Sequence, residues 1–289
     1  MALPVLFGAN IDPVAQPLDA PLRSLAAAEQ LGLDFATIQD HPYQRRFHDT
    51  WTLLTFLAAK TERITLVPTV ANLPLRPPAV LAKSAASLDL LTGGRVQLGL
   101  GAGAFWDAIE AMGGPRRTPG EAVQALEEAI DVIRAMWSGE RTVRTTGIHH
   151  ALAGIHPGPQ PSPGLGIWLG ALGRRSLALT GRKADGWIPS LSFLPPEQLG
   201  ASSRRIDDAA AEAGRDPAAI RKVYNLNGVI GGDSAVPFRG PAEAWVEQIL
   251  EIIEDAGMNA FAYWPDEDHL RQTELFANEV VPAVRTALG

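Results

Sequence analysis

Short apolar runs alternate with longer amphipathic segments along the whole chain. The run Ile64–Val70, for example, is apolar and rich in β-branched residues, which is typical of a buried parallel strand. Between such runs, apolar residues recur with the three-to-four-residue spacing of a helix. Eight strands are predicted, at Leu3–Gly8, Asp34–Gln39, Ile64–Val70, Arg95–Gly101, Gly166–Gly170, Gly186–Pro189, Lys222–Gly231 and Asn259–Trp264.

A helix is predicted after each of these strands. The segment Leu18–Leu31 stops at Gly32, a residue suited to a helix C-terminus. Pro78–Leu91 has proline in its first turn and Gly93-Gly94 just past its end. The main helices are predicted at Leu18–Leu31, Thr50–Lys60, Pro78–Leu91, Pro119–Trp137, Arg174–Ala184, Pro196–Ala213, Pro241–Ala256 and His269–Leu288, with a short extra helix at Asp107–Met112.

Consecutive strand–helix pairs imply parallel strands joined by right-handed crossovers. Eight pairs in 289 residues fit the α/β class as a (β/α)8 TIM barrel, with an open doubly wound sheet as the alternative. No segment resembles a linker between two cores, so the prediction is one domain over residues 1–289.

The alternation breaks between Arg141 and Pro163. Residues 157–163 contain four prolines and a glycine, which oppose a helix. We therefore expect an irregular insertion after the fourth strand–helix unit, at about residues 140–165, with a short hairpin in it.

Composition and charge exclude several classes of function. The net charge is −7, with charges of both signs scattered, which argues against a nucleic-acid or anionic-membrane surface. The chain has no cysteine, so disulfides, thiolate catalysis and cysteine-based metal sites are excluded. The first residues do not resemble a signal peptide, and no apolar run reaches the length of a membrane span, so a cytoplasmic protein is expected.

Patterns that hold metal ions or activate serine are missing. His149, His150 and His156 fall in the insertion, away from any predicted strand end, and neither His-x-His on the first strand nor His-Glu-x-x-His occurs. Gly-x-Ser-x-Gly is also absent. No metal site is predicted, and a serine hydrolase is disfavoured.

Val96–Ile109 contains Gly99-x-Gly101-x-x-Ala104, which matches a loose dinucleotide-binding fingerprint. It is the fourth strand rather than the first, and no acidic residue ends a strand about 20 residues later, so the Rossmann interpretation fails. At the carboxyl end of a barrel strand, these glycines would let a ligand approach the backbone. The alternative is that they only permit close packing.

A second glycine stretch, Trp168–Ser176, is predicted to be a strand, a small loop and the start of a helix. Free N–H groups at a helix N-terminus bind phosphate, and Arg174 and Arg175 add positive charge there. From this segment alone, an ordinary turn with solvated arginines is an equal alternative.

Several motifs occur in order along the chain: Asp40-His41 after the second strand, Pro78–Lys83, Leu88–Arg95, Gly99–Gly103, Gly170–Gly173 and Ala184–Trp187. Together they resemble the bacterial luciferase-like monooxygenase superfamily over nearly the whole chain. The resemblance implies a (β/α)8 barrel that binds FMN or the deazaflavin coenzyme F420 at its carboxyl-end mouth. Gln39-Asp40-His41 is similar to the Ser-Asp-His of many deazaflavin members, with Gln in place of Ser, so coenzyme F420 is preferred and FMN is the alternative.

The resemblance also implies roles for individual residues. Asp40 and His41 would lie beside the cofactor ring as catalytic candidates, with His41 as proton donor or acceptor. The end of the third strand matches the place where the family has a non-prolyl cis peptide behind the ring. Phe105 and Trp106, which follow the glycines, are candidate walls of the substrate space, with core between the loop and the barrel top as the alternative, and Asp107 is a candidate acid. The cofactor-binding residues are expected to be Asp40, Thr69, Val70, Ala71, Gly101, Ala102, Gly103, Gly170, Ala171, Leu172, Gly173 and Arg174.

The expected activity is hydride transfer between coenzyme F420 and a small organic substrate. The alternatives are an FMN-dependent, oxygen-activating monooxygenase, a non-catalytic flavin-binding barrel, and a lyase or aldolase on the same fold. The identity of the substrate, the direction of hydride transfer and the oligomeric state, with a homodimer as one option, stay open.

Overall fold

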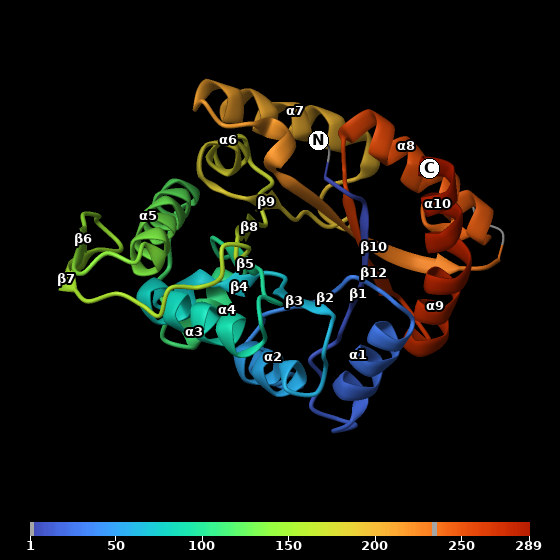
Figure 1. Cartoon of the computed structure of the whole chain (residues 1–289), viewed down its shortest axis with the longest axis horizontal. Helices are drawn as coiled ribbons and strands as arrows, with labels where there is room; N and C mark the ends of the chain where they lie inside the picture. Colours follow the sequence, from blue (N-terminus) through green and yellow to red (C-terminus); the bar gives the residue numbers. More distant parts are fainter. Residues whose placement is uncertain (1–2, 233–235) are drawn as a thin grey trace.

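The computed structural model describes residues 3–232 and 236–289. At its centre, parallel strands form a ring with helices around the outside (Figure 1). The hydrogen-bonded order is β3-β2-β1-β12-β10-β9-β8-β5-β4. The eight main strands are β1 (Leu6–Asn10), β2 (Phe35–Ile38), β3 (Thr65–Pro68), β5 (Leu98–Gly101), β8 (Ile167–Leu169), β9 (Gly186–Trp187), β10 (Arg221–Ile230) and β12 (Ala260–Pro265).

The ring closes between the third and fourth barrel strands. Leu66 in β3 forms a parallel bridge with Val96, just before β5. The two-residue strand β4 (Ala71–Asn72) follows β3 and pairs with β5. Because the sheet returns on itself, the predicted TIM barrel is confirmed and the open doubly wound sheet is wrong.

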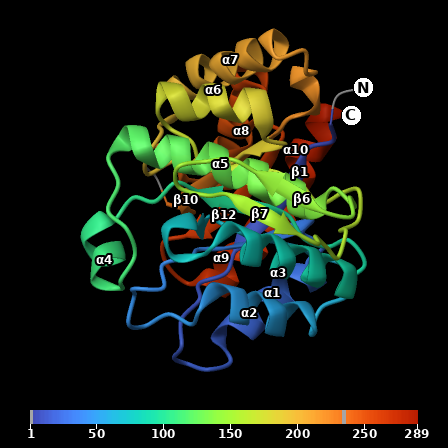
Figure 2. The same cartoon turned by 90° about the vertical axis from the view of Figure 1, so that its left-hand side faces the viewer.

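Helices follow the barrel strands as expected and pack outside them (Figure 2). The helix α5 illustrates how local sequence determines a helix. Thr118 and Glu121 form a capping box that fixes its start, and its one apolar face is buried. The helices are α1 (Ala20–Gln30), α2 (Thr50–Ala58), α3 (Pro78–Leu91), α4 (Trp106–Ala111), α5 (Pro119–Trp137), α6 (Arg174–Lys183), α7 (Pro196–Glu212), α8 (Ala242–Ala256), α9 (His269–Leu275) and α10 (Val281–Leu288).

Alternate side chains along the strands pack into two separate groups. One group joins the strands to the helices and includes Phe7, Ala36 and Leu169. The other contains side chains from neighbouring positions on the same strands, such as Phe35 and Trp168. Since successive side chains of a strand point to opposite faces, the second group fills the inside of the barrel.

The insertion contains the predicted hairpin, formed by the antiparallel strands β6 (Val143–Thr145) and β7 (Leu152–Ile155). It projects beyond α5, at the left edge of Figure 1. Glu128 of α5 holds its turn, because the carboxylate accepts hydrogen bonds from the N–H groups of Ile148, His149 and His150 at 3.0, 2.6 and 2.9 Å.

Some element boundaries differ from the predictions. The first strand was expected at Leu3–Gly8 but spans Leu6–Asn10, because the backbone of Asn10 still pairs with Thr37 of β2, and the side-chain amide of Asn10 also donates to Thr37 Oγ1 at 3.1 Å. The predicted helix His269–Leu288 divides into α9, a π-helical turn η3 (Phe276–Val280) and α10. The short elements η1 (Leu73–Leu75), η2 (Pro217–Ala219) and β11 (Arg239–Gly240) were not predicted.

In the part of the chain that the structure describes, no helix is both long enough and apolar enough to cross a membrane.

Candidate functional site

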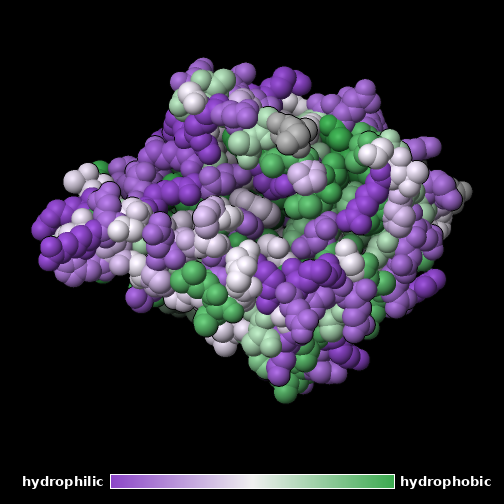
Figure 3. Space-filling model, in the orientation of Figure 1, coloured by the Kyte–Doolittle hydropathy of each residue, from purple (hydrophilic) through white to green (hydrophobic). Residues whose placement is uncertain are grey.

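A cavity of about 490 Å³ opens at the carboxyl ends of the barrel strands. The volume lies within the usual range for small-molecule sites, and barrel enzymes keep their sites at this end. The cavity opens on the side turned away from the viewer in Figure 3, which shows the opposite face of the barrel, with hydrophilic residues covering much of its edge and hydrophobic ones lying nearer the middle. The lining residues are Gln39, Asp40, His41, Tyr43, Thr69, Val70, Ala71, Asn72, Gly101, Ala102, Gly103, Ala104, Phe105, Gly170, Leu172, Ile188, Pro189, Ser190, Ser192, Phe193, Asn227 and Trp264.

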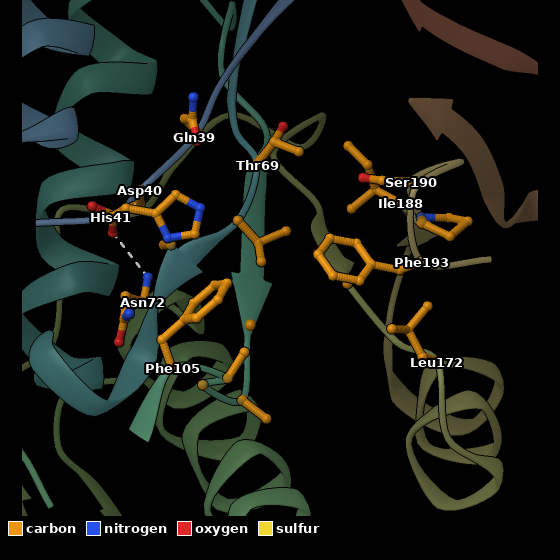
Figure 4. Close-up of a pocket in the computed structure, with 18 of the residues that line it drawn as sticks. Gln39, Asp40, His41, Thr69, Asn72, Phe105, Leu172, Ile188, Ser190 and Phe193 are labelled. Atoms are coloured by element: carbon orange, nitrogen blue, oxygen red, sulfur yellow. Dashed lines mark hydrogen bonds between the residues drawn. The ribbon is translucent and has the colours of Figure 1, made fainter. Parts of the chain in front are cut away.

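Two walls face each other across this cavity (Figure 4). Asp40, His41, Asn72 and Phe105 lie on one side, and Leu172, Ile188, Ser190 and Phe193 on the other. The first wall comes from the ends of β2, β4 and β5, and the second from the segments that follow β8 and β9.

Most of the predicted site residues come together here. Ala171, Gly173 and Arg174 are the exceptions, since they do not line the cavity. Ala171 is buried beneath the loop, where its carbonyl accepts a hydrogen bond from Trp187 Nε1 at 2.8 Å. Gly173 is the N-cap of α6, and Arg174, the first residue of that helix, is exposed on the surface. Their predicted contact is with a phosphate, which would lie outside the cavity, so this role stays a prediction.

The Thr69–Val70 peptide bond is cis, as the resemblance led us to expect. Three glycines make room for this segment. A Cβ on Gly99 would lie 1.9 Å from the Pro68 carbonyl oxygen, and one on Gly101 would lie 2.6 Å from Val70 Cγ2. A Cβ on Gly170 would lie 3.1 Å from the same methyl group. Gly99 is therefore required by its close contact with the end of the neighbouring strand β3, not by a helix, while Gly101 both packs against Val70 and borders the cavity.

Asp40 is buried, and its carboxylate is fully engaged by neighbours. It accepts hydrogen bonds from Arg76 Nε at 2.6 Å, from Arg76 Nη2 at 2.8 Å and from the Asn72 N–H at 2.8 Å. Arg76 also contacts Asp49 at 2.6 Å. Burial alone would lower the pKa of Arg76, but the hydrogen bonds and charges of the two carboxylates raise it above its usual value. These contacts suit a role for Asp40 in positioning the segment around Asn72.

His41 forms a compact group with two other rings. Its Nδ1 lies 2.8 Å from the Tyr43 hydroxyl, and its ring centroid lies 5.5 Å from those of Tyr43 and Phe105. Burial lowers the pKa of His41, although the charge of Asp40 opposes this. Burial, with help from Asp40, raises the pKa of Tyr43 to about 12. At neutral pH the site therefore holds a neutral imidazole and a protonated phenol.

Three polar atoms around the cavity are buried without a hydrogen-bond partner among the described residues: Thr69 Oγ1, Asn72 Oδ1 and Asn227 Oδ1. Buried polar atoms in folded proteins are nearly always paired with protein, water or ligand. The rest of the lining is largely apolar, with Val70, Ile188 and others as walls. A flat ligand with apolar faces and a polar edge fits this combination.

Sequence reasoning missed the wall that follows β9, together with Asn72, Tyr43 and Asn227. Asn227 carries the one available signal, since it is a polar residue inside the apolar strand β10. Arg76 was also missed, because 36 residues separate it from Asp40 and no pattern marks it.

The remaining candidates lie elsewhere. The candidate acid Asp107 is exposed outside the cavity, where it pairs with Arg116, as does the neighbouring Glu110. Trp106 packs near Gly103 rather than lining the cavity. Over residues 3–232 and 236–289, no group of three or more histidine, cysteine or acidic side chains is placed to hold a metal ion.

Comparisons with known proteins find similar chains over most of this sequence. The family model described as luciferase-like monooxygenase matches residues 2–276. The phthiodiolone/phenolphthiodiolone dimycocerosates ketoreductase of Mycobacterium tuberculosis is 35% identical over 241 residues, which are 80% of this chain and 60% of that protein. The F420-dependent hydroxymycolic acid dehydrogenase of the same organism is 29% identical over 308 residues, covering 90% of this chain and 82% of that one.

Two solved structures illustrate the shared fold. An F420-dependent secondary alcohol dehydrogenase, in complex with an F420–acetone adduct, has a TM-score of 0.85 at 18% identity and covers 98% of this chain and all of its own (100%). The oxygenating constituent of 3,6-diketocamphane monooxygenase from Pseudomonas putida, in complex with FMN, has a TM-score of 0.78 at 20% identity and covers 98% of each chain.

Proposed function

The chain belongs to the luciferase-like monooxygenase family, and from that premise we propose that it is an oxidoreductase that transfers a hydride between coenzyme F420 and a small organic substrate. The observation that carries the proposal is the cavity itself, in which buried, unpartnered polar atoms border largely apolar walls. The F420-dependent relatives support the choice of cofactor. The ketoreductase, of which this chain covers 60%, supports the reaction class.

The residues present fit a deazaflavin ring. Val70 and Ala71 would lie behind the ring, and Gly101 to Gly103 beside it. The hydroxyl of Thr69 and the amide of Asn72 would meet its polar edge, since both carry unpartnered buried oxygens. When bound, coenzyme F420 supplies the carbon that gives or accepts the hydride.

The charged tail of the cofactor would leave the cavity toward the start of α6. Gly170 lines the cavity, and Gly173 is the N-cap of the helix, so the free N–H groups of the first turn are available to a phosphate. Arg174 and Arg175 have no ion pair among the described residues, which leaves both charges free for an anion.

The opposite wall would hold the substrate. Ile188, Phe193 and Trp264 are apolar and exclude water from the reacting atoms, while Ser190 and Asn227 offer hydrogen bonds. Among the described residues, three titratable side chains line the cavity. Asp40 is occupied by Arg76, and burial raises the pKa of Tyr43 to about 12, so a proton exchanged with the substrate oxygen passes through His41.

Titration of the purified protein with coenzyme F420 and with FMN tests this proposal, with fluorescence as the signal. We expect F420 to bind with a Kd below about 100 μM and more tightly than FMN. Thr69→Val should weaken this binding, whereas Thr180→Val, at a buried threonine away from the cavity, should leave it unchanged. If neither cofactor binds, the proposal fails.

The same titration distinguishes the proposed F420-dependent enzyme from an FMN-dependent alternative. The FMN-bound monooxygenase of this fold favours an oxygen-activating enzyme as the second candidate. That enzyme would bind FMN more tightly than F420 and would consume oxygen once its flavin is reduced in the presence of substrate. A non-catalytic barrel would bind cofactor without turning over any secondary alcohol or ketone.

A further inference from the structure

A histidine that exchanges protons needs a partner on its other ring nitrogen, because that hydrogen bond decides which nitrogen carries the proton. The adjacent carboxylate of Asp40 does not fill this role for His41. Its oxygens accept from Arg76 and from the Asn72 N–H, and no hydrogen bond joins it to the imidazole among the described residues.

The partner of the imidazole is Tyr43, two residues along the same loop. Its hydroxyl lies 2.8 Å from Nδ1. The ring of Phe105 contacts both residues edge-on, with centroids 5.5 Å from His41 and 6.0 Å from Tyr43. Figure 4 shows the His41 ring reaching from this wall toward the cavity, with Phe105 beside it. Contacts on two sides therefore hold the imidazole in one orientation.

The direction of the hydrogen bond follows from the strengths of the two groups. Nδ1 is the one partner of the Tyr43 hydroxyl among the described residues. Either direction leaves one hydrogen without a protein acceptor, on Nε2 or on the hydroxyl, but a phenol is a stronger donor than a neutral imidazole N–H and an imidazole nitrogen is a stronger acceptor than a phenol oxygen, so the hydroxyl donates. A donating hydroxyl places the proton of the neutral imidazole on Nε2. Nε2 has no partner within residues 3–232 and 236–289, so Nε2–H is free for a ligand.

We propose that Tyr43 is a positioning residue that fixes His41 as its Nε2–H tautomer, and that the site is thereby built to reduce a carbonyl substrate, a ketone or an aldehyde. This inference rests on the proposed function, with reduced coenzyme F420 as the hydride source. A neutral imidazole can polarise a carbonyl by hydrogen bonding without being ionised.

The proton that the reduction consumes passes through this pair and is replaced from solvent. As the hydride forms the new C–H bond, the electron pair of the C=O π bond moves to oxygen, and that oxygen takes the proton of Nε2. Nδ1 then takes the hydroxyl proton of Tyr43, so the imidazole stays neutral, and water returns a proton to the phenolate. Without the hydroxyl, a neutral His41 that gave up its proton would become an imidazolate.

The charged groups around His41 leave this assignment intact. Asp40, held by Arg76, is the carboxylate that acts on the pKa of the imidazole. From the loop after β5, Phe105 is uncharged, and the facing residues Ser190, Ser192 and Asn227 are uncharged as well.

The test is Tyr43→Phe, which keeps the ring contacts and removes the hydroxyl. Nitrogen-15 NMR of the imidazoles, above the pKa of His41, should show Nε2–H in the parent protein and a mixture of tautomers in the variant. The matched control is Tyr224→Phe, which removes a hydroxyl that donates to the Leu194 carbonyl, away from the cavity. This measurement needs no cofactor, so it stands apart from the proposed function. An unchanged His41 tautomer in Tyr43→Phe overturns the inference.

Kinetics supply the second readout. With reduced F420 and a ketone, kcat of Tyr43→Phe should fall by about 10- to 100-fold, while the Kd for F420 stays within about twofold. The parent activity should be nearly flat across neutral pH. In the variant only the imidazolium can donate, so activity should fall as pH rises through the lowered pKa of His41. A variant profile that stays flat contradicts the role of Tyr43, whereas failure of F420 to bind contradicts the proposed function.

Discussion

The carboxylate of Asp40 and the guanidinium of Arg76 meet through two hydrogen bonds, at 2.6 and 2.8 Å, across 36 residues of sequence. The side chain of Asp40 is 1% exposed, and that of Arg76 is 17% exposed. The pair joins the end of β2 to the segment after β4, so it sets the distance between His41 and Asn72 on one wall of the cavity. Paired, planar bonds of this kind need the fork of arginine.

Arg76→Lys should therefore destabilise the protein although it conserves the charge. Lysine cannot make both contacts to Asp40 and also reach Asp49, so a buried carboxylate loses a charged hydrogen bond. We expect the free energy of unfolding, measured in urea, to fall by about 1.5–3 kcal/mol. The control is Arg116→Lys, at an exposed arginine that pairs with Asp107 and Glu110, and it should cause no measurable change. Equal effects of the two substitutions would refute a special role for the buried pair.

The contact between Gly101 and Val70 gives a second prediction. A methyl group on Gly101 would lie 2.6 Å from Val70 Cγ2, so Gly101→Ala should lower the free energy of unfolding by about 1–3 kcal/mol through overpacking. Val70→Ala removes the obstructing methyl groups. In a protein that already carries Val70→Ala, Gly101→Ala should lower the free energy of unfolding by at least about 1 kcal/mol less than it does in the parent protein.

The control for this cycle is Gly164→Ala, because nothing lies within 4 Å of a Cβ there and the backbone conformation is ordinary. It should leave stability unchanged. If the effects of Gly101→Ala and Val70→Ala simply add, the methyl groups of Val70 are not what excludes a Cβ at position 101.

These two relationships also mark the limit of prediction from sequence. The order of strands and helices follows from local patterns: α3 and α5 begin and end at the predicted residues, because proline, glycine and a capping box stand at their ends.

The first wall of the cavity was found because His41 and Gly101 stand at strand ends in motifs of adjacent residues. Arg76 and Phe193 were not found, because their places depend on contacts between distant segments that leave no local pattern. The sequence did not show that Ala171 is buried away from the cavity, because a loop sequence does not show which of its side chains points inward, and the predicted part of Ala171 in binding phosphate stays a prediction.

The hairpin of the insertion should weaken in acid through Glu128. Burial opposes ionisation, but three backbone N–H donors lower the pKa of this carboxyl from 4.5 to about 2. A carboxyl with a depressed pKa contributes stability above its unfolded value, and this contribution is lost as pH falls from about 4.5 toward 2. Parent protein should therefore lose stability more steeply over this range than Glu128→Gln, as measured by urea unfolding at several pH values.

The neighbouring variant Glu127→Gln serves as the control for this measurement. Glu127 pairs loosely with Arg182 and Lys183, at 3.7 and 3.4 Å, and holds no backbone N–H of the hairpin. Its acid profile should match that of the parent protein. If Glu128→Gln also matches the parent, the carboxylate does not stabilise the turn.

Thr69 should show opposite effects on stability and on binding. Its hydroxyl is buried beside the cavity without a partner among the described residues, so the protein without cofactor bears the cost of an unsatisfied polar group. Thr69→Val keeps the shape and removes the hydroxyl, so we expect the free energy of unfolding to rise by up to about 1 kcal/mol and the Kd for coenzyme F420 to increase by about 5- to 10-fold. Thr180→Val removes a buried hydroxyl that is already bonded to the Ser176 carbonyl at 2.9 Å, so it should lower stability and leave binding unchanged. Urea unfolding and fluorescence titration measure the two quantities separately, and a Thr69→Val protein that loses stability without losing affinity would mean that this hydroxyl serves the fold rather than a ligand.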